Sequence, residues 1–378
     1  MNLNMTISQQ WIDHDKNIRP YIWSHFVLRI GRTCLTLGLT IWFVVSLRAF
    51  YLEMYLEKNI SYSFGVWLAY FGIIGAVLEV TTFPFSIAHH WIEKSYQLSK
   101  QTYLSWFWDK VKGWLVGGVL GVLFLGILFG CVIYFESSWW WITAFLFILV
   151  SIGLAQLAPV LLIPLFFKLE PMEPSPLKDR LLKMCESFKV EVKEVYHLGM
   201  GEKTEKGNAA FVGLGKTKRI MIGDTLYKKF APEEVEAVFA HELGHQVHND
   251  LWKGILLFGV FLFAVFYVTQ VLLSHYVHPF FQTEMVHPFG VFSFFVVFSL
   301  VQIPVGFIQI LFSRWRERMA DQFAFERIGS GEKLADALEK LTYQNRGLFK
   351  PNRFIEFFTY SHPAPWRRIT KLREVKVS

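Results

Sequence analysis

The sequence predicts an α-helical integral membrane protein of about six spans with a small α+β domain on the cytosolic side. Hydrophobic residues make up 53% of the 378 residues and charged residues 18%, whereas soluble domains have roughly 25% charged residues. The apolar residues gather in runs long enough to cross a bilayer, which requires about 20 residues. Between the fourth and fifth runs, about 85 mostly polar residues can form one small folded unit.

The predicted spans are six apolar runs, of which the second and the fourth are long and contain proline. The runs are Thr33–Leu52, Phe64–Ala88, Trp114–Phe135, Trp139–Phe167, Trp252–Ser274 and Phe289–Phe312. Pro84, Pro159 and Pro164 predict kinks, or helices that extend beyond the membrane. Glu79 lies in the second run, and because a carboxylate facing lipid costs about 3 kcal/mol, it should face protein or water. It could line a wet cavity or pair with an arginine, and the candidates are Arg29, Arg32 and Arg48.

The distribution of Lys and Arg predicts which parts of the chain face the cytosol. These residues gather in the N-terminal arm, the second loop and residues 168–253, whereas the first loop has Lys58 alone and the third and fifth loops have none. Since Lys and Arg favour the cytoplasmic side, both termini and residues 168–253 should be cytosolic. The net charge of +7 then reflects loops that face anionic lipid, and we expect no nucleic-acid partner.

The polar segment between the fourth and fifth spans predicts mixed helix and strand. Leu177–Phe188 has the helical spacing of apolar residues, while Val190–His197 and Arg219–Ile222 resemble strands. Asn208–Leu214 could form a short strand between them. A further helix should begin at Pro232, because proline suits a first turn and the glutamates that follow complement the positive end of a helix.

That helix carries the motif His241-Glu242-Leu243-Gly244-His245 two to three turns from its start. Residues i and i+4 share one face of a helix, so His241 and His245 can bind one metal ion while Glu242 stands beside it as a general base. A hydrolytic zinc ion has three protein ligands and one water. The motif therefore predicts one zinc ion whose third ligand lies elsewhere in the chain.

Membrane topology narrows the choice of the third ligand. Candidates in the fifth loop lie across about 30 Å of hydrocarbon from the motif; they are His275, His278, Glu284 and His287. The sixth span returns the chain to the cytosolic face, where Glu317 and Asp321 are again four residues apart. We expect Glu317 to bind zinc and Asp321 to orient a ligating imidazole. The alternative is a solvated helix whose acids pair with Arg314 and Arg318.

Three further polar residues keep more than one interpretation. His248 and Asp250 follow the motif closely. Either could replace Glu317, although solvation at the surface is the simpler role. His362 lies in the rigid turn Ser361-His362-Pro363-Ala364-Pro365, where local chemistry favours a functional and a purely structural role about equally.

Short motifs in a fixed order carry a family resemblance. In the second half they are Asn208-Ala209, Lys218-Arg219-Ile220, Asp224-Thr225-Leu226, His241-Glu242-Leu243-Gly244-His245, Glu317-x-x-Ala320-Asp321, Ser361-His362-Pro363 and Arg368. In the first half they are Phe83-Pro84-Phe85-Ser86, Ile92-Glu93-Lys94 and Gln101-Thr102. This order resembles the type I CAAX prenyl proteases, which are integral-membrane zinc metallopeptidases. The resemblance covers the chain from about residue 60 to its end.

The resemblance implies a helical membrane chamber capped by a gluzincin-type zinc metallopeptidase domain. It implies one zinc ion held by His241, His245 and Glu317. It implies Glu242 as base and acid, with the other catalytic-site roles at Asp321, His362 and Arg368. Asn208 and Ala209 would pair with the substrate backbone, and His362 and Arg368 would lie near the scissile carbonyl. The expected partners are the lipid bilayer and a peptide or protein substrate, with or without a prenyl group, and we expect a monomer.

The chain departs from the pattern of that family in three respects. The family has seven spans, and this sequence predicts six, without the first. The usual H-P-P sequence is His362-Pro363-Ala364 here. The C-terminal residues Val375-Lys376-Val377-Ser378 contain no endoplasmic-reticulum retrieval signal. This favours a bacterial plasma membrane, where prenylated substrates are not expected.

Two other functions fit part of the pattern. An HtpX-like membrane quality-control protease shares the metal motif but has fewer spans, and the four spans before the motif favour the CAAX type. A zinc-binding channel or scaffold would hold a structural zinc ion, which four ligands usually close and which needs no base. We expect four parts: 1–168 with four spans, 169–250 with the motif helix, 251–313 as a two-span hairpin, and 314–378 with the third ligand.

Overall fold

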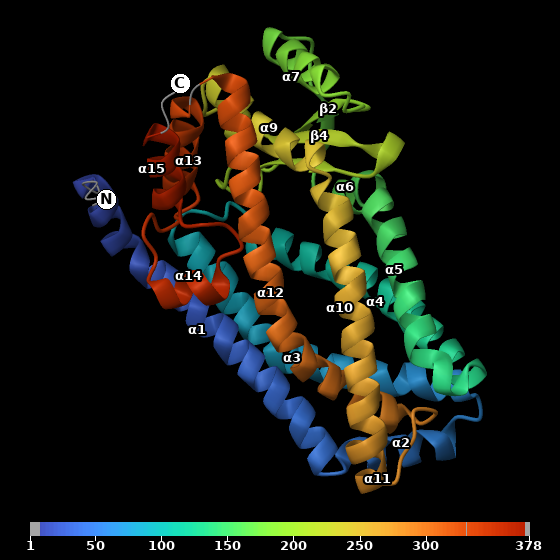
Figure 1. Cartoon of the computed structure of the whole chain (residues 1–378). Helices are drawn as coiled ribbons and strands as arrows, with labels where there is room; N and C mark the ends of the chain where they lie inside the picture. Colours follow the sequence, from blue (N-terminus) through green and yellow to red (C-terminus); the bar gives the residue numbers. More distant parts are fainter. Residues whose placement is uncertain (1–7, 330, 375–378) are drawn as a thin grey trace, which may run out of the picture.

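The computed structural model describes residues 8–329 and 331–374, and the chain is built mainly from helices (Figure 1). Among the described residues, six helical segments are long and apolar enough to cross a membrane. They are α1 (Gln9–Val45), α3 (Ser63–Ser95), α4 (Tyr103–Tyr134), the segment Glu136–Phe166 with α5 (Trp139–Leu157) and α6 (Ile163–Phe166), the segment Asp250–Phe281 with α10 (Asp250–Leu272) and α11 (His278–Phe281), and α12 (Pro288–Ile328). The predicted helical membrane fold is confirmed.

The first span differs from the sequence prediction. The apolar run predicts Thr33–Leu52, whereas α1 begins at Gln9 and ends at Val45. The chain breaks at Leu47, which has a positive φ of 58°, and α2 (Arg48–Asn59) follows. The polar first turns of α1 lie beside the C-terminal part of the chain, where the Trp11 ring stacks on Phe349 with 4.8 Å between ring centroids. Hydropathy misplaced this span because those first turns are helical without being apolar.

The helices α10 and α12 run along the length of the molecule, from its lower end to the sheet and the C-terminal helices (Figure 1). They pack against each other, and Phe266 of α10 lies 5.2 Å from Phe294 of α12 between ring centroids. α12 is 41 residues long and contains Pro304. The helix continues without interruption through residue 313, where the sequence suggests a boundary between the two-span hairpin and the C-terminal part.

Two carboxylates in the N-terminal helices have polar partners. Glu79 accepts a hydrogen bond from the Trp114 indole at 3.0 Å and lies 3.9 Å from the Arg32 guanidinium, so one of the predicted arginine partners is correct. Glu53 of α2 is only 3% exposed and accepts the Phe289 backbone N–H at 2.9 Å. Glu53 thus satisfies an amide at the N-terminus of α12, where an anion is favourable.

The polar end of the molecule contains a sheet with one parallel and two antiparallel strand pairs. Its strands are β1 (Leu169–Pro171), β2 (Val195–Leu198), β3 (Ala209–Val212) and β4 (Arg219–Gly223), in the order β1-β2-β4-β3. β3 is therefore an edge strand. The sequence predicts the last three strands, although β2 begins at Val195 and not at Val190, and β1 was not predicted.

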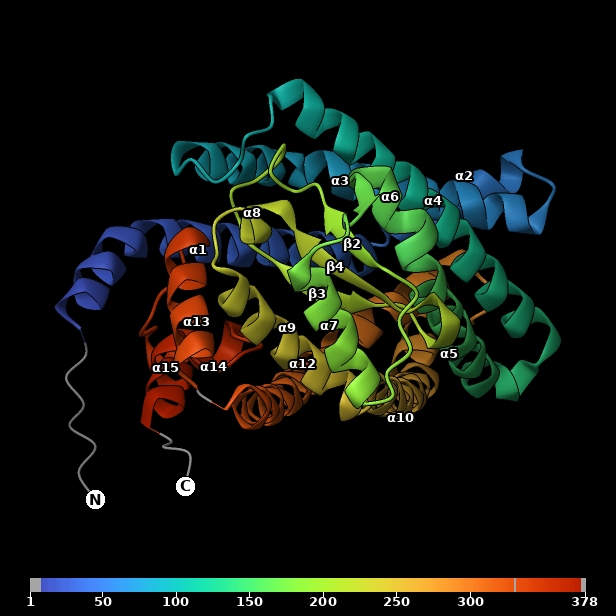
Figure 2. The ribbon, with the colours of Figure 1, turned by 90° about the horizontal axis from the view of Figure 1, so that it is seen from above.

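Helices cover one face of this sheet (Figure 2). α9 (Pro232–Val247) and α7 (Pro176–Ser187) share a core with β2 and β4, in which Phe239 and Leu243 of α9 pack with Ile220 and Ile222 of β4. α8 (Asp224–Tyr227) connects β4 to α9. The C-terminal helices are α13 (Glu332–Gln344), α14 (Arg353–Thr359) and α15 (Pro365–Glu374). α13 packs against α9, while α14 and α15 contact α12.

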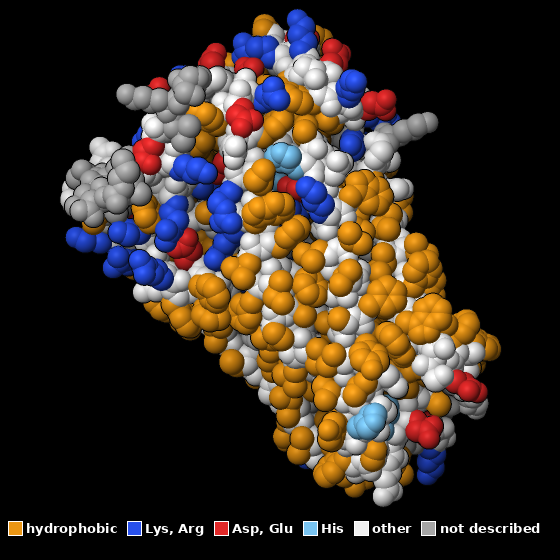
Figure 3. Space-filling view, in the orientation of Figure 1, with side chains coloured by type: hydrophobic (Ala, Val, Ile, Leu, Met, Phe, Trp, Pro, Cys, Tyr) orange, Lys and Arg blue, Asp and Glu red, His pale blue; other side chains and the backbone are white. Residues whose placement is uncertain are grey.

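The surface divides along the length of the molecule (Figure 3). Hydrophobic side chains cover the lower part, over α5, α10 and α12, and charged side chains gather around the sheet and the C-terminal helices. This distribution is the one expected of a bilayer-embedded helical region with a water-exposed domain. Residues 375–378, on which the argument from a missing retrieval signal depends, lie outside the described residues.

Candidate metal centre and active site

The N-terminus of α9 is closed as its sequence predicts. Pro232 occupies the first turn, and the Glu234 carboxylate accepts the Ala231 backbone N–H at 2.9 Å. This satisfies one of the amides that a helix leaves unpaired at its start. Lys340 of α13 donates to the same carboxylate at 2.8 Å. The helix that carries the metal motif is thus anchored at its first turn.

Gly244 sets the distance between α9 and α12. A Cβ atom at this position would lie 3.2 Å from the Ala320 Cα and 3.1 Å from the Phe323 ring. Any side chain here would push the two helices apart, because the protein interior is close-packed. The glycine inside the motif therefore brings Glu317, which is one turn from Ala320 on α12, within reach of the two histidines.

His241, His245 and Glu317 converge on one point. One ligand atom from each lies within 4.8 Å of the others. His241 Nε2 and His245 Nε2 each lie 3.4 Å from an oxygen of Glu317. Ligand atoms at 2.0–2.1 Å from a tetrahedral ion are about 3.3–3.4 Å apart, so these distances fit one zinc ion. Two imidazoles and one carboxylate are also the donor set of a hydrolytic zinc site.

A buried carboxylate stands behind each histidine. His241 Nδ1 lies 2.9 Å from Asp321 Oδ1, and His245 Nδ1 lies 2.8 Å from Asp250 Oδ2. Asp321 and Asp250 are 7% and 3% exposed. Such contacts fix the ring orientation and the tautomer, so that Nε2 is presented to a metal. Asp321 therefore lies where it can orient the His241 ring, which is the role that the sequence predicts for it.

From the sequence, solvation at the surface was the simpler role for Asp250. The structure contradicts this, because the Asp250 carboxylate is buried against His245. The residue before it, Asn249, has a left-handed φ of 55°, and this turn places Asp250 behind His245 at the start of α10. The sequence feature that could have indicated this contact is a carboxylate five residues after His245. His248 is not solvated at the surface either, because its ring is half-buried and lies 5.9 Å from Phe323 between ring centroids.

The two histidines have unusual proton affinities. Burial alone would lower the pKa of each, but the carboxylates beside them more than offset this. Asp250 and Glu317 raise the pKa of His245 to about 9, and Asp321 and Glu317 also raise the pKa of His241. The site is therefore a strongly electronegative pocket that attracts a cation, whether a proton or a metal ion.

Glu242 lies beside the ligands without joining them. Burial raises the pKa of its carboxyl above the ordinary value, although the nearby histidines oppose the shift. A raised pKa brings a carboxylate closer to the range in which it can accept a proton and return it near neutral pH. Glu242 lines the same cavity as His241 and Glu317.

Arg368 and His362 approach the centre from the C-terminal segment. Arg368 forms a two-bond contact with Asp321, with Nε at 2.8 Å and Nη2 at 2.6 Å from the two carboxylate oxygens, and its Nη1 lies 3.5 Å from Glu317. His362 Nδ1 lies 2.8 Å from Glu317 Oε2, and its side chain is 58% exposed. Arg368 is thus committed to Asp321, whereas His362 is open to the cavity.

The cavity over the metal ligands holds about 330 Å³. α9, α12, α13 and the C-terminal segment contribute to its walls, and so do Asn208 and Ala209 at the start of β3. The structure therefore brings the residues that the sequence predicts for the catalytic site to one place. Among the described residues that contact the ligands, Asp250 is one whose role the sequence did not indicate.

The excluded ligand candidates lie at the other end of the molecule. His278 begins α11, which is far from α9 in Figure 1. His287 is paired with Glu53 at 2.9 Å. Two other groups in the described residues have metal-ligand spacing: Glu53, Glu57 and His287, and His25, His89 and Glu93. In each, a carboxylate already bonds a backbone amide or the Lys206 ammonium, with Lys206 Nζ 2.9 Å from Glu93.

Two family matches cover most of the chain. Residues 171–376 match Peptidase family M48, and residues 21–168 match a domain described as CAAX prenyl protease N-terminal, five membrane helices. Within that N-terminal match, the described residues of this chain carry four candidate spans.

Individual relatives agree with these matches. An uncharacterized metalloprotease, YhfN, of Bacillus subtilis is 24% identical over 84% of this chain and 76% of its own length. CAAX prenyl protease 1 of Saccharomyces cerevisiae is 25% identical over 81% of this chain and 71% of its own length. The Arabidopsis thaliana homologue of CAAX prenyl protease 1 is 29% identical over 77% and 69%.

One solved structure has the same fold. The crystal structure of S. mikatae Ste24p superposes with a TM-score of 0.83, covers 95% of this chain and 88% of its own, and is 22% identical in sequence. Together with the family matches, this establishes that the predicted resemblance is correct. The chain belongs to peptidase family M48 and is a multi-pass membrane metallopeptidase homologous to CAAX prenyl protease 1.

Proposed function

We propose that the chain binds one zinc ion through His241, His245 and Glu317 and hydrolyses peptide bonds at the cytosolic face of a membrane. The observation that carries this proposal is the convergence of three ligand atoms within 4.8 Å, beside a carboxylate that is not a ligand. A structural zinc site would be closed by a fourth protein ligand and would need no base. The channel or scaffold alternative leaves Glu242 without a role.

A bound zinc ion would lower the pKa of a water molecule and polarise the scissile carbonyl. Glu242 accepts the proton of the attacking water and returns it to the leaving amine. His362 donates to the oxyanion from the open side of the cavity. Arg368 holds Asp321 against His241, so its part is to keep the ligand oriented.

The edge strand β3 offers a surface on which a substrate can be held. Antiparallel pairs alternate between hydrogen-bonded and non-hydrogen-bonded residues. Because the Gly223 N–H donates to the Asn208 carbonyl at 2.8 Å, and Ala209 is opposite Ile222 in the register, the peptide groups of Ala209 point away from β4. An extended peptide can add to such an edge. This supports the assignment of Asn208 and Ala209 to substrate binding.

The substrate class we propose is membrane-associated peptides and proteins of the CAAX prenyl protease type. The N-terminal match at residues 21–168 and the relatives named CAAX prenyl protease 1 support this over an HtpX-like quality-control role. The excess of Lys and Arg in the loops on the catalytic side supports a cytosolic active site. We infer a bacterial plasma membrane, where a substrate need not carry a prenyl group, and the relative from Bacillus subtilis supports this location.

Replacing Glu242 tests the mechanism. Glu242→Gln should retain one zinc ion per chain, measured by elemental analysis, and lose at least about a thousandfold in cleavage rate, because the amide accepts no proton. Matched peptides with and without a farnesyl group, assayed with the wild-type enzyme, determine whether the lipid is required. A Gln variant with full activity would exclude Glu242 as the base, and a wild-type protein without zinc would exclude the metal assignment.

A further inference from the structure

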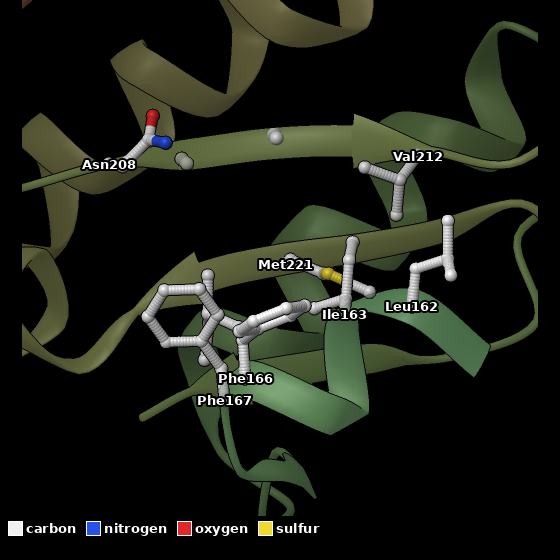
Figure 4. A pocket seen from close by; sticks show the side chains of 10 residues that line it. Leu162, Ile163, Phe166, Phe167, Asn208, Val212 and Met221 are labelled. Carbon is white, nitrogen blue, oxygen red and sulfur yellow. The ribbon is translucent and has the colours of Figure 1, made fainter. Parts of the chain in front are cut away.

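A second, apolar cavity lies on the other face of β3 (Figure 4). It holds about 280 Å³ and is lined from the sheet by Leu198, Asn208, Ala209, Ala210, Val212 and Met221, and from the end of the fourth span by Leu162, Ile163, Phe166 and Phe167. Among the described residues that line it, none is charged, and Asn208 is the one polar residue. Figure 4 shows Val212 extending from the strand toward the apolar side chains below it.

This cavity adjoins the active site. Asn208 and Ala209 line both the apolar cavity and the cavity over the metal ligands. They are the residues at which the edge of the sheet reaches the catalytic centre. A peptide held on this edge beside the metal would therefore lie along the rim of both cavities.

The pleat of β3 assigns the two cavities to opposite faces of the sheet. Ala209 and Phe211 pack against the core shared with α9, and the Phe211 ring lies 5.4 Å from Phe239 between centroids. Successive side chains of a strand alternate between faces, so Ala210 and Val212 face the opposite side, toward α6. A peptide paired with β3 has the same alternation. One of its side chains faces the metal cavity, and its neighbour faces the apolar cavity.

We propose that the apolar cavity is a specificity subsite that receives one large aliphatic or aromatic side chain of the substrate, next to the scissile bond. The inference rests on the proposed peptidase function and on pairing at Ala209. A volume of about 280 Å³ is at the lower limit of small-molecule pockets, which start near 300 Å³, so it suits a single side chain. The lack of charged residues predicts that a substrate lysine at this position is rejected.

Two neighbouring leucines allow a matched test. Leu162 lines the cavity, whereas Leu161 is 55% exposed on the outer surface of the same helical segment. Leu162→Trp should fill part of the cavity, and Leu161→Trp adds the same bulk without entering it. Val212→Ala enlarges the cavity without adding bulk. All three residues are outside the metal site, so zinc content should stay at the wild-type level.

The assay is cleavage of peptides in which each position around the scissile bond is changed in turn to Ala, Leu, Phe or Lys. Wild type should prefer Leu or Phe at one position by roughly tenfold or more over Ala and reject Lys there. Leu162→Trp should lose roughly tenfold in kcat/KM for Leu and Phe at that position but leave the Ala peptide within about threefold. Leu161→Trp should match wild type, and Val212→Ala should shift the preference toward Phe.

Three results would overturn the proposal. Wild type cleaving all peptides equally would show that no such subsite exists, and equal effects of the two tryptophans would show that the cavity is not involved. Variants that change the preferred prenyl chain length, but not the side-chain preference, would make a lipid chain the occupant. If Leu162→Trp fails to fold, Val212→Ala must still show the shift toward Phe. Failure of the proposed function is distinct, because wild type would then cleave no peptide.

Discussion

Asp250 is the residue whose replacement tests the metal centre most sharply. Its carboxylate lies 2.8 Å from His245 Nδ1, and Asp250→Asn removes the charge while keeping the size and an acceptor oxygen. Asp250 and Glu317 together raise the pKa of His245 to about 9 against burial. The shift from the ordinary value of 6.5 corresponds to about 3 kcal/mol, at about 1.4 kcal/mol per pH unit.

The raised pKa determines the sign of the pH dependence. A ligating imidazole must be neutral, so zinc has to displace the proton that His245 holds below pH 9. At pH 7 most His245 side chains hold this proton, because the pKa of about 9 lies well above that pH. Zinc affinity of the wild type should therefore rise with pH between 7 and 9 and level off above that range.

The Asp250→Asn variant changes this curve in two ways. Above pH 9 the loss of the supporting carboxylate should weaken zinc binding by about 10- to 100-fold. At pH 7 the loss should be smaller, because the pKa of His245 falls and fewer protons compete. The expected signature is a weaker plateau that is reached at a lower pH. His241 contributes to the pH dependence of zinc affinity in both proteins. The difference between the wild-type and Asp250→Asn curves therefore reports the contribution of His245.

The assay is competition for zinc with a coloured chelator in detergent, repeated at half-unit steps from pH 6.5 to about 10, a range set by the pKa of His245. Glu233→Gln, which removes an exposed carboxylate from the first turn of α9, is the matched control and should follow the wild-type curve. If Asp250→Asn bound zinc with the wild-type plateau and the wild-type pH slope, the assignment of Asp250 to His245 would be refuted.

Three further predictions concern the surroundings of the ligands. Gly244→Ala should gain about 1 kcal/mol in helix propensity but lose about 1–3 kcal/mol through the 3.1 Å contact with Phe323. We therefore expect a lower melting temperature and weaker zinc binding. Unchanged zinc binding would show that the spacing of α9 and α12 does not determine the geometry of the site. Arg368→Lys should lower kcat roughly 10- to 100-fold, because lysine cannot form the two-bond contact with Asp321; wild-type kcat would contradict this role. Removal of zinc with o-phenanthroline should abolish cleavage and lower the melting temperature, since a ligand at 100 times its Kd stabilises the fold by about 2.7 kcal/mol. Added zinc should restore both, and activity that survives complete zinc removal would contradict a zinc mechanism.

The residues that sequence reasoning placed well are those whose geometry is local or topological. His241 and His245 share a helix face at any location in the protein. Glu317 and Asp321 were identified from membrane topology. The sixth span brings the chain back to the side of the motif, and the histidines of the fifth loop lie on the opposite side. Each of these inferences used a constraint that does not depend on side-chain packing.

Asp250 and Glu53 could not be placed in this way. The contact of Asp250 with His245 depends on a single left-handed residue, Asn249 at φ 55°, and asparagine only permits that conformation. The contact of Glu53 with Phe289 joins α2 to the start of α12 across more than two hundred residues. The start of α1 at Gln9 was missed for a similar reason, because packing against Phe349 keeps a polar segment helical.

The metal ligand Glu317 lies on the same continuous helix, α12, that crosses the membrane, so a tilt of this helix would move the ligand. Its 41 residues span about 60 Å at 1.5 Å per residue, and Glu317 lies about 44 Å from its first residue. A rigid tilt of about 5° about that end would move the ligand carboxylate by about 4 Å, far more than the roughly 0.2 Å that a metal–ligand distance tolerates. Helices tilt to match the thickness of the bilayer. A change in bilayer thickness that tilted α12 would therefore change the coordination geometry unless α9 moved with α12.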